Sequence, residues 1–201
     1  MAYYCAVHQR MFEKKSVVEL GGGSTCLAGV MLAMTLKPSR VLLSDGNQKC
    51  VETLEEIAVV CRKHGGENVC VSLIRWDIPD RYNDRADSFD FVICADCLFF
   101  DEGRPHLVTV IHTILKLGGK ALVFAPRRGK TLDQFLELCS VRFSRATLFE
   151  SYCPLLSEKH ENLMKTNKLY KPDLHYPLLI ELIKWNSWRI LYASAHFIDR
   201  K

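Results

Sequence analysis

Residues 17–29 read VVELGGGSTCLAG, and this stretch decides the fold. Two β-branched valines lead into Glu19, a leucine and three consecutive glycines. A structural turn needs one or two glycines, whereas three of them let the backbone approach a ligand closely. The first N–H groups of a following helix would face the same loop. The stretch therefore predicts a ligand-binding turn at the end of a first buried strand.

The composition is that of one soluble globular domain. The chain has 201 residues, 48% hydrophobic and 25% charged, which is enough for a single core and too little for two ordinary domains. No run of 18 apolar residues and no signal-peptide core is present, so we expect no membrane contact. The net charge of +4 is too small to predict nucleic-acid binding, but it suits an acidic protein partner. We expect a monomer in the cytoplasm, with the nucleus as a second location.

The nine cysteines do not read as a disulfide framework. Their number is odd and most have apolar neighbours, which indicates buried free thiols in a reducing compartment. Cys94 and Cys97 form a CxxC, but no second pair and no histidine at ligand spacing accompanies it, so we expect no metal. We interpret Cys94 and Cys97 as small hydrophobic residues at a strand end, and the alternative is a zinc-binding or redox-active pair.

Short apolar runs alternate with segments of helical periodicity. Apolar residues at positions 51, 54, 58 and 61, for example, recur with helical spacing. This alternation predicts βαβ units with right-handed crossovers, and hence a doubly wound, mostly parallel α/β sheet. Residues 153–173 are polar and form either a short helix or a flap, and residues 186–201 fit no element. The expected strands are residues 16–20, 40–44, 69–75, 89–95, 120–126, 145–151 and 178–184.

Acidic and aromatic residues follow the ends of several expected strands, where ligands bind in such sheets. Asp45 ends the second strand, 45 − 21 = 24 residues after Gly21, and an acid there accepts both hydroxyls of a ribose. Asn47 is a natural N-cap for the next helix, which explains Asn47 without a ligand but leaves Asp45 unexplained.

The third and fourth strands also end in polar and aromatic groups. Trp76 and Asp77 would flank an adenine, one by stacking and one through the exocyclic amine, although a core Trp with a turn Asp explains them equally well. Asp96 lies where the sheet opens, and Phe99 and Phe100 after it are hard to bury on one face.

The glycine stretch separates two kinds of cofactor. The spacing GxGxxG of dinucleotide-binding folds is missing, and so is the GxxxxGK[ST] of a phosphate loop. Glu19, two residues before Gly21, would oppose a diphosphate and favour the cationic amino-acid end of a sulfonium cofactor. The residues therefore favour S-adenosylmethionine.

The chain resembles the seven-strand, S-adenosylmethionine-dependent methyltransferases, and within them the family-16 protein-lysine methyltransferases. The general motifs mark the superfamily, whereas VFAPRRG and ADCLF are far more specific. The resemblance implies a seven-stranded, Rossmann-like methyltransferase domain over residues 1–184, without the family's upstream N-terminal segment, and an unassigned tail over residues 185–201. Thr25 stands near the place of a third loop glycine in many relatives. The matching stretches are AYYC, ELGGGSTCLAG, VLLSDGN, RWD, FDFVICADCLFFD, GGKALVFAPRRG and HYPLLIELIK.

The resemblance also implies a site and an activity. The activity is transfer of methyl groups from S-adenosylmethionine to a lysine side chain of a protein substrate, calmodulin. Asp96 and Phe99 would shape the lysine channel as catalytic residues. Independently of the resemblance, Arg127, Arg128 and Lys130 follow the fifth strand and form either a solvated loop or, if the target is calmodulin, cations that steer the acidic partner into place. A truncated or catalytically silent fold with only a binding role is the alternative. A small-molecule methyltransferase or nucleotide-binding Rossmann protein is a third, which APRRG and ADCLF disfavour. The implied cofactor-binding residues are Glu19, Gly21, Gly22, Gly23, Asp45, Gly46, Asn47, Trp76, Asp77 and Ala95.

Overall fold

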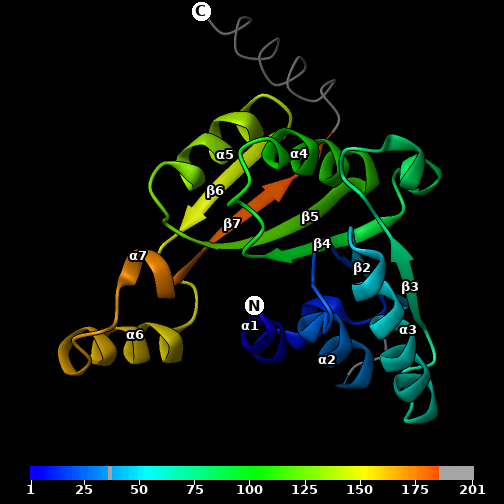
Figure 1. Cartoon of the computed structure of the whole chain (residues 1–201), viewed down its shortest axis with the longest axis horizontal. Helices are drawn as coiled ribbons and strands as arrows, with labels where there is room; N and C mark the ends of the chain where they lie inside the picture. Colours follow the sequence, from blue (N-terminus) through cyan, green and yellow to red (C-terminus); the bar gives the residue numbers. More distant parts are fainter. Residues whose placement is uncertain (36–37, 186–201) are drawn as a thin grey trace, which may run out of the picture.

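The computed structural model describes residues 1–35 and 38–185, and its centre is a seven-stranded sheet (Figure 1). The strand order is β3-β2-β1-β4-β5-β7-β6. Neighbouring strands among β1 to β5 run parallel, whereas β7 is antiparallel to both β5 and β6. The prediction of a doubly wound, mostly parallel sheet is confirmed. The strands are β1 (Ser16–Glu19), β2 (Arg40–Asp45), β3 (Val69–Leu73), β4 (Phe89–Ala95), β5 (Leu115–Pro126), β6 (Arg145–Phe149) and β7 (Pro177–Ile183).

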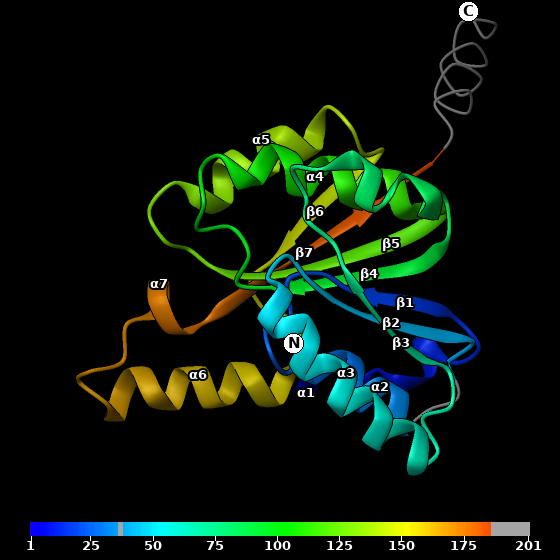
Figure 2. The ribbon, with the colours of Figure 1, turned by 45° about the vertical axis from the view of Figure 1, so that its right-hand side comes forward.

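Helices cover both faces of this sheet (Figures 1 and 2). On one face lie α1 (Ala2–Val7), α2 (Leu27–Thr35) and α3 (Gln48–Lys63), and on the other lie α4 (Gly103–Ile114) and α5 (Thr131–Ser140). The described residues also form three short 3-10 helices: η1 (Gln9–Phe12), η2 (Pro79–Arg81) and η3 (Asn83–Arg85).

Residues 153–173 are largely helical. They contain α6 (Pro154–Thr166), which has no buried residue, and the start of α7 (Pro172–His175). The helix interpretation of this segment is therefore correct. The tail at residues 186–201 lies outside the described residues, so the domain boundary at residue 184 stays a prediction.

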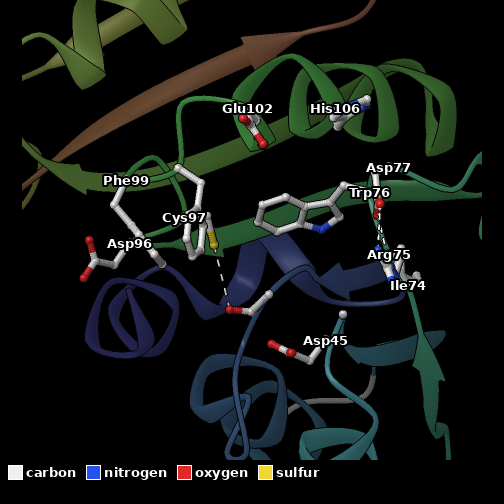
Figure 3. Close-up of a pocket in the computed structure, with 14 residues that line it drawn as sticks. Asp45, Ile74, Arg75, Trp76, Asp77, Asp96, Cys97, Phe99, Glu102 and His106 are labelled. Carbon is white, nitrogen blue, oxygen red and sulfur yellow. Dashed lines mark hydrogen bonds and ion pairs between the residues drawn. The ribbon is translucent and has the colours of Figure 1, made fainter.

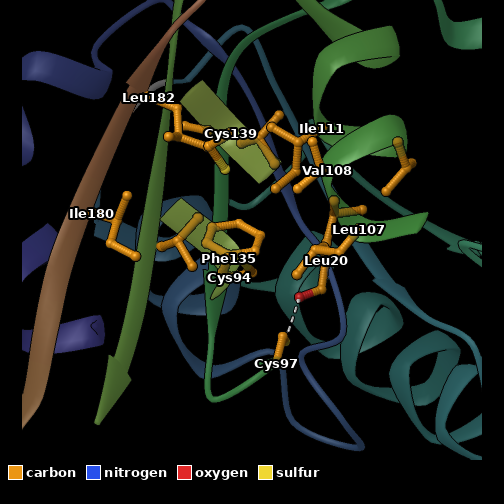
Figure 4. Packing of buried hydrophobic residues seen from close by; sticks show 14 of the residues in the cluster. Leu20, Cys94, Cys97, Leu107, Val108, Ile111, Phe135, Cys139, Ile180 and Leu182 are labelled. Carbon is orange, nitrogen blue, oxygen red and sulfur yellow. Dashed lines mark hydrogen bonds between the residues drawn. The ribbon is translucent and has the colours of Figure 1, made fainter. Parts of the chain in front are cut away.

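The core explains why these runs became strands. Val17 and Val18 are both fully buried although they point to opposite faces of β1, because helices cover each face. The larger apolar cluster lies between the sheet and α4 and α5, where Leu107 and Ile111 of α4 meet Phe135 of α5 (Figure 4). No helix in the described ranges is long and apolar enough to cross a membrane.

The start of β5 is the largest difference from the expected strand bounds. β5 begins at Leu115, five residues before the expected start at Lys120, because Leu115 pairs with Phe89 across an irregularity in the ladder. Gly118, at φ +78°, and Gly119 lie within the strand. All nine cysteines are free and seven are buried, as the sequence predicts.

Candidate active site

The carboxyl ends of β1 to β4 and the start of α4 enclose a cavity of about 710 Å³ (Figure 3). This volume is in the range of small-molecule and cofactor sites. The strand order reverses between β1 and β4, which is where ligands bind in doubly wound sheets. The structure brings seven of the predicted site residues to its wall: Gly21, Asp45, Gly46, Trp76, Asp77, Asp96 and Phe99.

Five predicted residues do not line this cavity: Glu19, Gly22, Gly23, Asn47 and Ala95. Seven other residues line it: Ile74, Arg75, Cys97, Phe100, Glu102, Gly103 and His106. Of these, Cys97 and Phe100 were singled out in the sequence, but no site role was predicted for the other five. Glu102 and His106 are four residues apart and so share a helix face. This spacing of two polar residues, just before the apolar stripe of α4, is the sequence pattern from which Glu102 and His106 could have been predicted as site residues.

Gly21 is the point of closest approach between the first loop and its surroundings. Its φ is +61°, and a Cβ there would lie 2.8 Å from Cζ2 of Trp76 and 3.0 Å from Sγ of Cys97. Only glycine meets both the backbone and the steric requirement. At Gly21 the loop therefore packs closely against Trp76 and Cys97, and close approach to a ligand stays a prediction.

Asp45 connects the first loop to the second strand. Its Oδ2 accepts the backbone N–H of Gly23 at 2.9 Å, and its Oδ1 accepts the N–H of Asn47 at 2.9 Å. A carboxylate oxygen has two acceptor positions, so each retains one for a hydroxyl in the cavity. The Asn47 side chain accepts the N–H of Lys49 and caps α3, which confirms the structural interpretation of that residue.

Glu19 lies behind the loop rather than in the cavity. Its side chain is 3% exposed, and its Oε2 accepts the backbone N–H of Gly29 in the first turn of α2 at 2.5 Å. Burial raises the pKa of this carboxyl to about 7, although the N–H groups of α2 oppose the shift. Through this hydrogen bond Glu19 holds α2 to β1. Direct contact of Glu19 with a cofactor stays a prediction.

Trp76 spans the middle of the cavity wall (Figure 3). Its indole packs between Gly21 and Gly103, where an added Cβ on Gly103 would lie 3.9 Å from the ring. Its Nε1 is buried and has no hydrogen-bond partner among the residues that the structure describes. An unsatisfied buried donor costs about 1–3 kcal/mol, so an acceptor at this place would be stabilising.

Asp77 and Arg75 form an ion pair at one end of the cavity. Arg75 donates to the two carboxylate oxygens of Asp77 at 2.7 and 3.2 Å. This hydrogen bond lowers the pKa of Asp77, so its carboxylate is ionised at neutral pH. It is thereby available as an acceptor for an exocyclic amine.

Asp96 and Phe99 lie at the other end of the cavity (Figure 3), and Phe100 also lines it. Asp96 has a φ of +57°, and its carboxylate accepts two hydrogen bonds from Arg128. Phe99 and Phe100 are 52% and 60% exposed with ring centroids 4.1 Å apart, which confirms that they are not buried together. Arg127 pairs with Glu150 at 3.1 Å, so each of the two expected docking arginines has an acidic partner within the chain.

Arg104 holds the loop that carries these phenylalanines, and sequence reasoning missed it. Its guanidinium is buried and donates to the carbonyl oxygen of Leu98 at 2.9 Å, to Asp101 at 2.6 Å and to Gln134 of α5 at 2.7 Å. A buried arginine with three partners fixes the backbone just before Phe99.

Cys97 lies at the bottom of the cavity. Its Sγ is 3.3 Å from the carbonyl oxygen of Ala95 and 3.8 Å from that of Gly21. Cys94 is fully buried in β4, so the pair packs as small hydrophobic residues at a strand end. In residues 1–35 and 38–185 no group of His, Cys, Asp and Glu is placed to hold a metal ion.

The donors and acceptors of the cavity fit an adenosyl compound. Asp45 has free acceptor positions for a ribose, Asp77 is an ionised acceptor, and Trp76 supplies an aromatic surface. The three lie on neighbouring strand ends, as one ligand running along the cavity requires. A family model described as lysine methyltransferase matches residues 2–142 of the chain.

The chain belongs to the lysine methyltransferase family. It is 31% identical over 188 residues to a calmodulin-lysine N-methyltransferase of Arabidopsis thaliana, a match that covers 90% of this chain and 61% of that protein. It is 25% identical over 150 residues to a protein-lysine N-methyltransferase of Chaetomium thermophilum, which covers 71% and 44%. This lysine methyltransferase family member thus spans 44–61% of the length of these curated relatives.

A solved structure shows the same fold. The SAM-dependent O-methyltransferase of Thermotoga maritima superimposes with a TM-score of 0.62 at 15% identity, over 92% of this chain and 64% of that one. At this identity the likeness concerns the architecture of the sheet and its helices. The seven-stranded sheet of the lysine methyltransferase family member is therefore of the Rossmann-like methyltransferase type.

Proposed function

We propose that this protein is an S-adenosylmethionine-dependent protein-lysine methyltransferase whose substrate is calmodulin. The observation that carries the proposal is the convergence of Asp45, Trp76 and Asp77 on one cavity at the strand ends, with Asp96 and Phe99 at its other end. Family membership supports the reaction.

The residues present divide the cavity between cofactor and substrate. Asp45 accepts the ribose hydroxyls, Asp77 accepts the exocyclic amine of adenine, and Trp76 packs against the base. Gly21 lets the first loop approach the amino-acid end. S-adenosylmethionine supplies an electrophilic methyl group when it is bound.

The substrate amine enters from the Asp96 end. Free lysine has a pKa of about 10.4, and the attacking amine must be neutral, so the site has to favour loss of a proton. The exposed rings of Phe99 and Phe100 are available to a methylated ammonium through cation–π contact, worth about 0.5–2 kcal/mol. Asp96 aims the amine by a hydrogen bond. The remaining rate gain comes from positioning in a desolvated site.

Calmodulin is proposed as the substrate on two grounds. The relative in Arabidopsis thaliana carries that activity in its name, and the net charge of +4 suits an acidic partner. Arg127 and Arg128 were expected to steer this partner, and their ion pairs reduce the charge that each presents. A monomeric protein of the cytoplasm and nucleus is part of the same proposal.

Two measurements test the function. Calorimetric titration of the protein with S-adenosylmethionine should show one site per chain. Mass spectrometry of unmethylated calmodulin, after incubation with the protein and S-adenosylmethionine, should show added methyl groups. Cofactor binding with no methyl gain would favour the alternative of a methyltransferase fold with a binding role. Absence of cofactor binding would overturn the proposal.

A further inference from the structure

Arg128 reaches from the end of β5 to the carboxylate at the end of β4. Its Nη1 donates to Oδ1 of Asp96 at 2.7 Å and its Nη2 to Oδ2 at 3.1 Å. This is the two-point geometry that makes guanidinium–carboxylate pairs both strong and directional. Among the described residues, only Arg128 hydrogen-bonds the Asp96 carboxylate.

Backbone contacts fix both members of the pair. Asp96 donates its N–H to the carbonyl oxygen of Phe124 at 2.8 Å and is held at a φ of +57°, a strained conformation for aspartate. The carbonyl oxygen of Arg128 accepts the hydroxyl of Thr131 at 2.9 Å, at the start of α5. Because β4 and β5 are paired neighbours, the two side chains meet at one edge of the cavity.

We propose that Arg128 is a positioning residue for methyl transfer: it holds the Asp96 carboxylate toward the incoming lysine and balances its negative charge. The inference rests on the proposed function and assigns a role that differs from steering the partner. It concerns the proton on the substrate, which the reaction has to remove before attack.

The charge balance decides whether the substrate amine is ready to react. An isolated carboxylate stabilises a neighbouring ammonium, which keeps its proton and has no lone pair to donate. With Arg128 paired to Asp96, that stabilisation is reduced while the carboxylate oxygens remain hydrogen-bond acceptors. The ammonium then loses one proton to water. The neutral nitrogen forms the N–C bond with its lone pair, and the electron pair of the broken S–C bond stays on sulfur.

Other charges surround the pair. On the rim, Arg127 pairs with Glu150 from the end of β6, and Lys130 is exposed at the start of α5. The ionisable groups that line the cavity together with Asp96 are Asp45, Arg75, Asp77, Cys97, Glu102 and His106. None of these groups is changed in Arg128→Gln or Arg128→Lys, so a difference between either variant and the wild type reports on Arg128.

The pH dependence of kcat tests the role, because it reports ionisations in the enzyme–substrate complex. Arg128→Gln leaves the Asp96 carboxylate unpaired. The acid-side midpoint of kcat with calmodulin should then move upward by about half to one pH unit, a shift discounted for partial exposure. Arg128→Lys keeps the charge and should restore most of the midpoint. Titration with S-adenosylmethionine should give an unchanged affinity in Arg128→Gln, which shows that the cavity is intact.

Two further variants make the outcome specific. Arg127→Gln removes the neighbouring cation, which has similar exposure and its own acidic partner, and it should leave the midpoint in place. Asp96→Asn combined with Arg128→Gln removes both charges and should return the midpoint toward the wild-type value. An unmoved midpoint in Arg128→Gln, with an active wild-type enzyme, would overturn the inference alone. An inactive wild-type enzyme would overturn the proposed function and this inference with it.

Discussion

The carboxylate of Asp45, at the end of β2, accepts the backbone N–H of Gly23 in the loop after β1 at 2.9 Å. The same carboxylate therefore shapes the glycine loop and presents its remaining acceptor positions to the cavity. β1 and β2 are parallel neighbours, so their carboxyl ends meet at one edge. The loop and the acid form one unit, although 22 residues separate Gly23 from Asp45 in the chain.

Asp45→Ala should weaken S-adenosylmethionine binding about 10- to 100-fold, because hydrogen bonds to a charged acceptor contribute about 1.5–3 kcal/mol. Calorimetric titration measures the change. Asp80→Ala, an exposed aspartate outside the cavity lining, is the control and should bind like the wild type. Equal affinity in Asp45→Ala would show that the cofactor lies elsewhere.

Gly21→Ala should destabilise the fold and weaken cofactor binding. The new Cβ would lie 2.8 Å from Trp76 Cζ2 and would sit at a φ of +61°. Gly129→Ala is a matched control, because Gly129 has a φ of +57° but no atom within 4 Å of an added Cβ. Both variants carry a backbone cost of about 1–2 kcal/mol. Urea unfolding should show an additional loss in Gly21→Ala, and equal losses would mean that Trp76 moves aside freely.

The sheet was predictable because its strands are buried on both faces and read as continuous apolar runs. The start of β5 could not be predicted, because two consecutive glycines, Gly118 and Gly119, are typical of a turn. This segment is a strand because Leu115 pairs with Phe89. The local sequence gives the conformational preference of a residue, whereas strand pairing depends on which residues the fold places beside it.

In the site, too, some features follow from the local sequence and others depend on the fold. Asp45 was predictable from its spacing to Gly21, since both positions follow directly from strand ends. The ion pair between Asp96 and Arg128 joins residues 32 apart and depends on the adjacency of β4 and β5. The contact of Trp76 with Gly103 likewise depends on where α4 begins. Such contacts have no local pattern that a sequence can show.

Arg104→Met should destabilise the fold by about 1–3 kcal/mol, because the carbonyl oxygen of Leu98 loses its buried donor. Asp101 is largely exposed and can be rehydrated, so it adds little to the cost. The loop with Phe99 and Phe100 should also become less fixed, which lowers kcat/KM for calmodulin. Urea unfolding and steady-state kinetics measure the two effects. Arg142→Met, an exposed arginine, is the control, and an equal loss in both variants would contradict the role of Arg104.

Glu19 predicts a specific dependence of stability on pH. Its carboxyl has a pKa of about 7 in the folded protein, against an ordinary value of 4.5, because burial disfavours the charge. Between these two values the folded state binds more protons than the unfolded state, so the free energy of unfolding falls as pH rises from 4.5 through 7. The full difference corresponds to about 3 kcal/mol.

Glu19→Gln isolates this contribution. The amide keeps an acceptor oxygen for the N–H of Gly29 but does not titrate. The variant and the wild type should therefore unfold with similar free energies at pH 4.5, where the wild-type carboxyl is protonated in the folded state. At pH 8 the variant should be the more stable of the two by up to about 3 kcal/mol, since it no longer carries a buried charge. Urea denaturation of both proteins at the two pH values measures the difference, and a variant that is less stable at pH 8 would mean that the ionised carboxylate, rather than its neutral form, holds α2 to β1.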